Sequence, residues 1–132
     1  MTTQQPQVAP PGFEGSLPEF LVFAELVRQG LVPGVDFIFQ SKRLGGRLDK
    51  GGLILDFIFN NPPNLAINVQ GVFFHYEQGS GIIANDRMSR AQVAGSGIVL
   101  IFIDEDDILR DVEFYVREAL LFNDHSRLGR GG

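Results

Sequence analysis

The chain has 132 residues, a formal net charge of −5 and no cysteine, which excludes a disulfide framework and a thiolate metal site. The negative net charge argues against a protein that coats nucleic acid non-specifically, because contacts to phosphates require clustered lysines and arginines. Hydrophobic residues make up 44% of the chain, enough for one domain with its own core. The longest apolar run is far shorter than a membrane span, and the N-terminus lacks the regions of a signal peptide. We therefore expect no membrane contact and a cytoplasmic location, or a virion if the chain comes from a phage.

Residues 1–15 are rich in glutamine, proline and glycine and are expected to form a disordered or extended N-terminal arm. Residues 16–30 predict a helix, because Ser16 and Glu19 have the spacing of a capping box and apolar residues follow at helical spacing. Gly30 suits the end of that helix. An arm of this composition suggests an oligomer or a larger assembly held together by residues 1–15.

Three strands are predicted next, at residues 35–40, 53–59 and 64–71. The polar, glycine-broken connection at residues 41–52 could be either a flexible hairpin loop or a binding loop. Asparagines and prolines between the second and third strands predict a tight turn, so these two strands are expected to form a hairpin.

The rest of the domain predicts a helix at about residues 85–94, a buried strand at residues 98–103 and an amphipathic helix from residue 104. The helix at 85–94 makes a crossover, so the strands on either side of it are expected to be parallel. The acidic run at residues 104–107 is expected to mark a helix N-terminus, where the dipole favours it, rather than a metal site. The domain spans residues 16–123, and residues 124–132 are expected to form a flexible C-terminal tail.

Asp56 is the unusual residue of the second strand, where Leu55 and Phe57 are expected on the opposite face. A carboxylate among apolar neighbours is costly to bury unless it is hydrogen-bonded, paired or bound to a metal. On the third strand Asn68 and Gln70 share one face, and a tight hairpin brings one of them beside Asp56. A carboxylate with amide or main-chain oxygens suits Mg²⁺. A plain polar cluster at the end of a sheet is the alternative.

The order of these features resembles the PD-(D/E)XK nuclease superfamily, and within it the very short patch repair endonucleases. A helix with a glutamate precedes a strand with Asp56, a strand with Asn68 and Gln70, a crossover helix and a further strand. The motifs that carry the resemblance follow one another as LDFIF, AINVQG, VFFH, NDRMSR and GSGIVLIF. The resemblance implies a restriction-endonuclease-like three-layer α/β sandwich, with a mixed central sheet flanked by helices.

The same resemblance implies a metal-dependent DNA endonuclease that nicks or cleaves the phosphodiester backbone. Asp56 would bind Mg²⁺ together with a main-chain carbonyl near Val69. His75 would act as the general base or position the attacking water, although a structural histidine is the alternative. Glu19 would match the glutamate of the first helix of the superfamily, unless it serves only as the capping residue.

DNA contacts are implied for residues around the site. Phe73 and Phe74 would match an aromatic pair that wedges between base steps, or they are core residues. Arg87 and Arg90 would contact phosphates, or pair with nearby acids. The basic residues of the loop would add to the DNA surface unless the loop is a solvated turn; they are Lys42, Arg43 and Arg47.

The match departs from the superfamily pattern at two positions. Asn68 stands where the superfamily usually has an acid, and Gln70 where it usually has a lysine. Asn68, the acidic net charge and the arm at residues 1–15 favour a second function, whereas a glutamine at the position of Gln70 is tolerated in some members of the superfamily. In that second function, the chain is a catalytically inactive nuclease fold that serves as a structural or scaffolding subunit, for example of a viral or mobile-element assembly.

Overall fold

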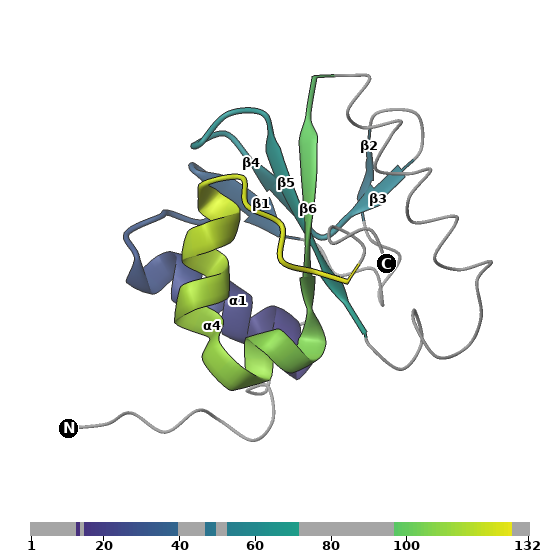
Figure 1. The fold of residues 1–132 in the computed structure, drawn as a ribbon. Coiled ribbons are helices and arrows are strands. Elements are labelled where there is room, and N and C mark those ends of the chain that lie inside the picture. Colours follow the sequence, from purple (N-terminus) through teal and green to yellow (C-terminus); the bar gives the residue numbers. More distant parts are fainter. Residues whose placement is uncertain (1–12, 14, 40–46, 50–52, 72–96, 128–132) are drawn as a thin grey trace.

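The computed structural model describes residue 13 and residues 15–39, 47–49, 53–71 and 97–127 (Figure 1). These residues form an α/β fold with a four-stranded mixed sheet and two helices, so the predicted α/β class is confirmed. In chain order the elements are α1 (Leu17–Arg28), β1 (Phe37–Phe39), β2 (Arg47–Asp49), β3 (Leu53–Leu55), β4 (Phe57–Phe59), β5 (Leu65–Gln70), β6 (Val99–Asp104) and α4 (Glu105–Leu120).

The four-stranded sheet has the order β1-β4-β5-β6. β4 pairs antiparallel with both β1 and β5, whereas β5 and β6 run parallel, in register from Leu65 opposite Val99 to Gln70 opposite Asp104. The predicted parallel pairing is therefore confirmed, and the carboxyl ends of β5 and β6 meet at one edge of the sheet. The helix predicted at residues 85–94 lies outside the described residues.

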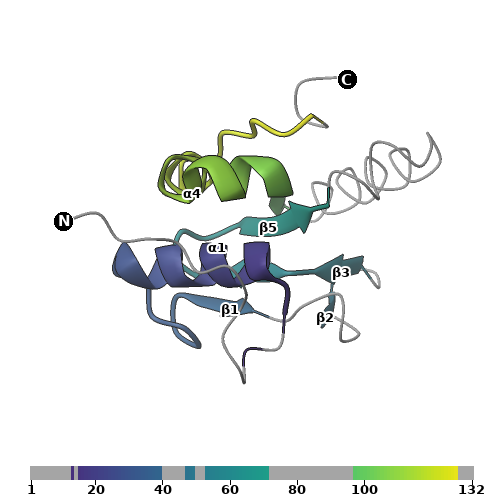
Figure 2. The ribbon, with the colours of Figure 1, turned by 90° about the horizontal axis from the view of Figure 1, so that it is seen from below.

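Both helices cover the same face of the sheet and pack against each other (Figures 1 and 2). Alternate side chains of β5 point to this face, among them Ile67, while Ala66 belongs to a second, smaller cluster on the other face. Burying one large apolar side chain contributes about 1.5–3 kcal/mol to stability. Most of the core therefore lies on the face of the sheet that the two helices cover. Its fully buried members include Val22, Leu26, Phe37, Phe57, Ile67, Ile108 and Val116.

Helix α1 begins with the predicted capping box. The main-chain N–H of Ser16 donates to Glu19 Oε1 at 2.7 Å, and the N–H of Glu19 donates to Ser16 Oγ at 3.2 Å. The box satisfies two amide groups that the first helical turn leaves without intrahelical partners. Just before it, Phe13 stacks on Phe39 with ring centroids 5.2 Å apart. The final part of the predicted arm is therefore anchored to the domain, while residues 1–12 lie outside the described residues.

The segment 53–59 was predicted as one strand, and this prediction is wrong. The chain bends at Asp56, and β3 leaves the main sheet to pair antiparallel with β2, with Arg47 opposite Leu55. The bend also reverses the faces, because Leu55 joins the second cluster while Phe57 faces the helices. Within residues 41–52, predicted as a hairpin loop or a binding loop, residues 47–49 therefore form a strand, and the other residues lie outside the described part of the chain.

The first predicted strand, residues 35–40, is shorter than expected, because a turn occupies its beginning. The main-chain N–H groups of Val35 and Asp36 both donate to the carbonyl of Val32, at 3.1 and 2.7 Å. Gly34, with φ of 84°, takes the left-handed conformation that this turn requires. β1 therefore begins only at Phe37.

After α4 the chain reverses and runs back beside β6 (Figure 1). The reversal is made by Phe122, whose φ of 67° is unusual for a bulky residue, and by a hydrogen bond from the N–H of Asn123 to the carbonyl of Glu118. We call residues 123–127 the C-terminal strap. Residues 124–132 were expected to form a flexible tail, but residues 124–127 hydrogen-bond to α4 and β6. Among the described residues, no helix has the length and apolar character needed to cross a bilayer.

The left-handed residue Phe122 gives a first testable prediction. Phe122→Gly should raise the free energy of unfolding by up to about 1 kcal/mol, because glycine adopts positive φ without a steric penalty. Leu121→Gly is the matched control, since Leu121 is also exposed but has φ of −94°; it should be neutral or destabilising. Urea unfolding of both variants measures the difference. Equal destabilisation by both would show that Phe122 is not strained.

Candidate functional site

Asp56 lies at the bend between β3 and β4 and is fully buried. Its main-chain N–H donates to Asn68 Oδ1 at 2.7 Å, and its Oδ2 accepts the main-chain N–H of Val69 at 2.9 Å. The sequence-based expectation that the hairpin brings Asn68 beside Asp56 is met. Both hydrogen bonds are buried, where leaving either group without a partner costs about 1–3 kcal/mol.

The register of the sheet explains why Asp56 makes these contacts. Phe57 pairs with Ile67 across β4 and β5, so a straight strand would place Leu55 opposite Val69. Leu55 pairs with β2 instead. The carboxylate of Asp56 thus accepts the N–H that a main-chain carbonyl of a continuous strand would have accepted.

The same geometry defines oxygen atoms that could bind a cation. In a β-strand, the N–H and C=O of one residue point toward the same neighbouring strand. The carbonyl of Val69 therefore points to the side from which the Asp56 carboxylate accepts the N–H of Val69. One carboxylate and one main-chain carbonyl are hard oxygen ligands that suit Mg²⁺, which retains several waters and needs few protein ligands. The residues present fit that ion.

Two further polar residues lie at the carboxyl edge of the parallel strands. Gln70 and Asp104 are register partners at the ends of β5 and β6, and both are fully buried. Strand alternation puts them on the same face as Asn68 and opposite to the helices. Asp104 was predicted only as part of an acidic helix start. Its signal in the sequence was its position at the end of an apolar strand, in phase with Leu100 and Phe102, which share the second cluster.

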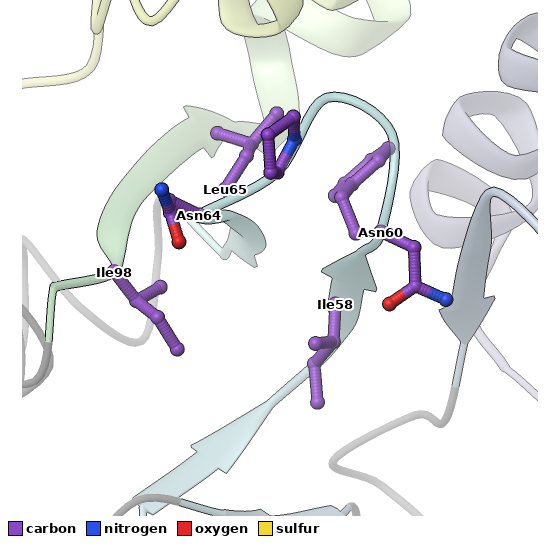
Figure 3. Close-up of a pocket in the computed structure, with 7 residues that line it drawn as sticks. Ile58, Asn60, Asn64, Leu65 and Ile98 are labelled. Atoms are coloured by element: carbon purple, nitrogen blue, oxygen red, sulfur yellow. The ribbon is translucent and has the colours of Figure 1, made fainter.

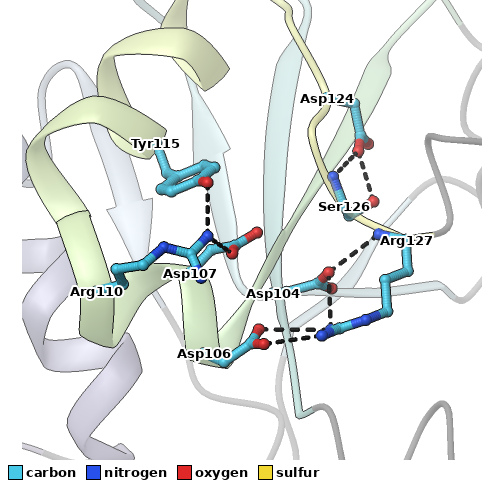
Figure 4. Close-up of polar contacts among 8 residues, drawn as sticks. All are labelled: Asp104, Asp106, Asp107, Arg110, Tyr115, Asp124, Ser126 and Arg127. Carbon is cyan, nitrogen blue, oxygen red and sulfur yellow. Dashed lines mark hydrogen bonds and ion pairs between the residues drawn. The ribbon is translucent and has the colours of Figure 1, made fainter.

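Asp104 begins an acidic cluster at the N-terminus of α4 (Figure 4). Carboxylate oxygens of Asp104, Asp106 and Asp107 lie within 4.8 Å of one another. Arg127 donates to Asp104 Oδ2 at 3.2 Å and to Asp106 Oδ2 at 2.8 Å, and Arg110 pairs with Asp107. These guanidinium groups supply the positive charge that three adjacent carboxylates require. The arrangement agrees with the expected helix start.

The other predicted site residues are not joined to Asp56 by the described contacts. Glu19 forms the capping box of α1, which accounts for its position. Arg47 lies in β2, and nothing beyond its backbone pairing is described. The remaining residues lie outside the described part of the chain: His75, Phe73, Phe74, Arg87, Arg90, Lys42 and Arg43.

A surface pocket of about 270 Å³ lies at the opposite end of β5, beside the turn that joins β4 to β5 (Figure 3). The side chains of Ile58, Leu65 and Ile98 form its apolar wall, and Asn60 and Asn64 are its polar residues. None of the described residues that line it has a titratable side chain, so these residues offer no acid or base for catalysis. The candidate functional site is therefore the other end of β5, beside Asp56.

Comparisons of the chain with protein-family models, with curated proteins and with solved structures found no match. The function is therefore argued from the residues themselves.

The hydrogen bond between Asp56 and Val69 predicts a difference between two substitutions. Asp56→Ala leaves the buried N–H of Val69 without its acceptor and should lower the free energy of unfolding by about 1–3 kcal/mol. Asp56→Asn keeps an acceptor oxygen of the same shape and should cost less. Chemical unfolding monitored by circular dichroism compares the two. If alanine and asparagine cost the same, the bond to Val69 does not stabilise the bend.

The pairing of Arg127 predicts a pH dependence. A hydrogen bond from Arg127 lowers the pKa of Asp106 below its usual value of 3.8. The stabilisation is therefore complete above pH 3.8 and is lost as the pH falls through the lowered pKa. Because the side chains of Arg127 and Asp106 are both partly exposed to solvent, Arg127→Met should cost only about 1 kcal/mol near neutral pH, and its difference from the wild type should shrink in acid.

Arg117→Met is the control, since Arg117 is an exposed arginine of α4 that lies outside the strap. It should be nearly neutral at pH 7. Unfolding curves from pH 7 down to pH 2 measure both variants. A penalty for Arg127→Met that stays constant over this range would contradict the ion pair.

Proposed function

We propose that the chain is a metal-dependent, DNA endonuclease-like protein that hydrolyses phosphodiester bonds at a site built around Asp56. One observation carries the proposal. The carboxylate of Asp56 is fully buried at a break in the sheet and is oriented by the main chain of Val69. Buried acids with fixed orientation are found preferentially at functional sites.

The order of the elements supports a restriction-endonuclease-like sandwich as the finer description of the fold. A first helix precedes three strands of the main sheet, and the fourth strand is parallel to the third. A three-layer sandwich requires a further layer on the face opposite to α1 and α4; residues 85–94, where a crossover helix is predicted, lie outside the described residues. On that face lie Asn68 and Gln70, the two residues that the resemblance assigns to the site.

The chemistry proposed for this site divides among a few groups. Asp56 and the carbonyl of Val69 would hold Mg²⁺, an ion that supplies positive charge next to the scissile phosphate. Asn68 fixes the bend by accepting the N–H of Asp56 at 2.7 Å. His75 takes a proton from the attacking water.

The DNA is held by residues that follow β5. Phe73 and Phe74 wedge between base steps. Arg87 and Arg90 contact phosphates. Through these contacts the chain would position the scissile phosphate beside Asp56.

A second function is favoured by a specific observation at the same place. Both described hydrogen bonds of Asp56 and Asn68 also serve the sheet, because they replace the main-chain pairing that the bend removes. Asn68 adds no negative charge beside Asp56. In this alternative the chain keeps a nuclease fold without activity and serves as a structural or scaffolding subunit, for example in a viral or mobile-element assembly.

Nicking of supercoiled plasmid with Mg²⁺ or Mn²⁺ tests the nuclease function. The wild type should nick, and Asp56→Asn should lower the rate by about 100-fold or more, because it removes the charge that holds the metal. Asp111→Asn is the control, because Asp111 is an exposed acid on α4; it should nick like the wild type.

The same variants separate the two functions. Loss of nicking in a folded Asp56→Asn protein supports catalysis, because its acceptor for Val69 is retained. If the folded wild type is as inert as Asp56→Asn with either metal and on both single- and double-stranded DNA, the enzymatic function is wrong and the structural function is favoured.

A further inference from the structure

The outer edge of β6 contacts the C-terminal strap, and none of the described strands pairs with it. Among the described strands, β6 pairs only with β5. On its other side the main-chain N–H of Phe102 donates to Asp124 Oδ2 at 3.0 Å. An uncovered strand edge is a template for pairing with another chain. The strap therefore protects β6 by a side-chain contact.

Side-chain contacts hold the strap at its far end (Figure 4) and at His125, its middle residue. At the far end, Arg127 pairs with Asp106 and with the fully buried Asp104, whose Oδ2 also accepts the main-chain N–H of Arg127 at 3.0 Å. Near α4, His125 Nε2 lies 2.9 Å from Glu118 Oε1. Charged side chains and a main-chain hydrogen bond thus hold the strap in place.

The hinge of the strap is strained. Phe122 connects α4 to the strap with φ of 67°, a conformation that bulky residues rarely adopt. Opening the strap lets Phe122 relax to an extended conformation. Strained, short hinge segments favour the exchange of an identical element between copies of a chain.

We propose that the C-terminal strap is exchangeable, so that the strap of one copy docks along β6 of a second copy. A second copy can bind the strap because it presents the same binding groups: the carboxylates of Asp104 and Asp106 and the main-chain N–H of Phe102. None of these contacts requires the strap and the sheet to belong to one chain. The proposal is independent of the proposed enzymatic function.

A charge-reversal pair tests the exchange. Arg127→Glu places a negative strap against its own acidic surface, and Asp106→Arg places a positive surface against its own Arg127. Each variant alone should have a loosened strap and stay monomeric. When the two are mixed, each strap meets an oppositely charged surface only on the other variant, so a heterodimer should form. Native mass spectrometry of the mixture detects it.

The chain that carries both substitutions is the control, because its strap and surface again attract each other within one copy. Circular dichroism should show that this chain is folded, and native mass spectrometry should show less dimer than in the mixture. If a single variant does not fold by itself, the two are refolded together from urea. A mixture that remains monomeric, while the doubly substituted chain is folded, would overturn the proposal.

The hinge supplies a second, independent measurement. Phe122→Gly removes the strain that opening would relieve, so it should lower the dimer fraction of the wild-type sequence at high protein concentration, whereas Leu121→Gly should not. Analytical ultracentrifugation over a concentration series measures this fraction. A wild type that stays monomeric up to the highest concentration, together with a monomeric mixture, leaves the strap as an intramolecular contact only.

Discussion

The hydrogen bond from the Val69 N–H to the Asp56 carboxylate determines the shape of the sheet. Strands that continue side by side satisfy each other's main-chain groups, and a strand that turns away leaves its neighbour with a buried amide. The side chain of Asp56 supplies the missing acceptor, so β3 can leave and pair with β2. The reversal of faces, which places Leu55 opposite to the helices, follows from the same bend.

This bond also explains why structural and chemical roles are difficult to separate at Asp56. A buried carboxylate is costly, and the bend alone could have been stabilised by an amide, which also accepts a hydrogen bond and carries no charge. The negative charge of Asp56 is therefore the feature that a purely structural role does not require. The hydrogen bond from the Asp56 N–H to Asn68 favours the structural role instead, because it uses the Asn68 amide oxygen to hold the sheet together. Activity and stability must therefore be measured on the same variants.

Local signals in the sequence were sufficient for α1, whose capping box depends on residues three apart, and for the parallel pairing of β5 with β6, which follows from chain connectivity. They were insufficient at Asp56, because period-two alternation runs through residues 53–59 without interruption and the bend depends on Val69, in another strand. The strap was missed for a related reason. Its polar residues resemble those of a free tail, and their partners in β6 and α4 are distant in sequence or become neighbours only through the reversal at Phe122.

The strap and the candidate site meet at Asp104. This residue is the register partner of Gln70 at the edge that also holds Asp56 and Asn68, and its carboxylate is bound by Arg127 of the strap. Docking of the strap thus adds a positive charge next to the polar end of β5 and β6. In an exchanged dimer that charge comes from the other copy. In either arrangement the buried carboxylate of Asp104 keeps an arginine partner, so exchange would not leave it without a counter-charge.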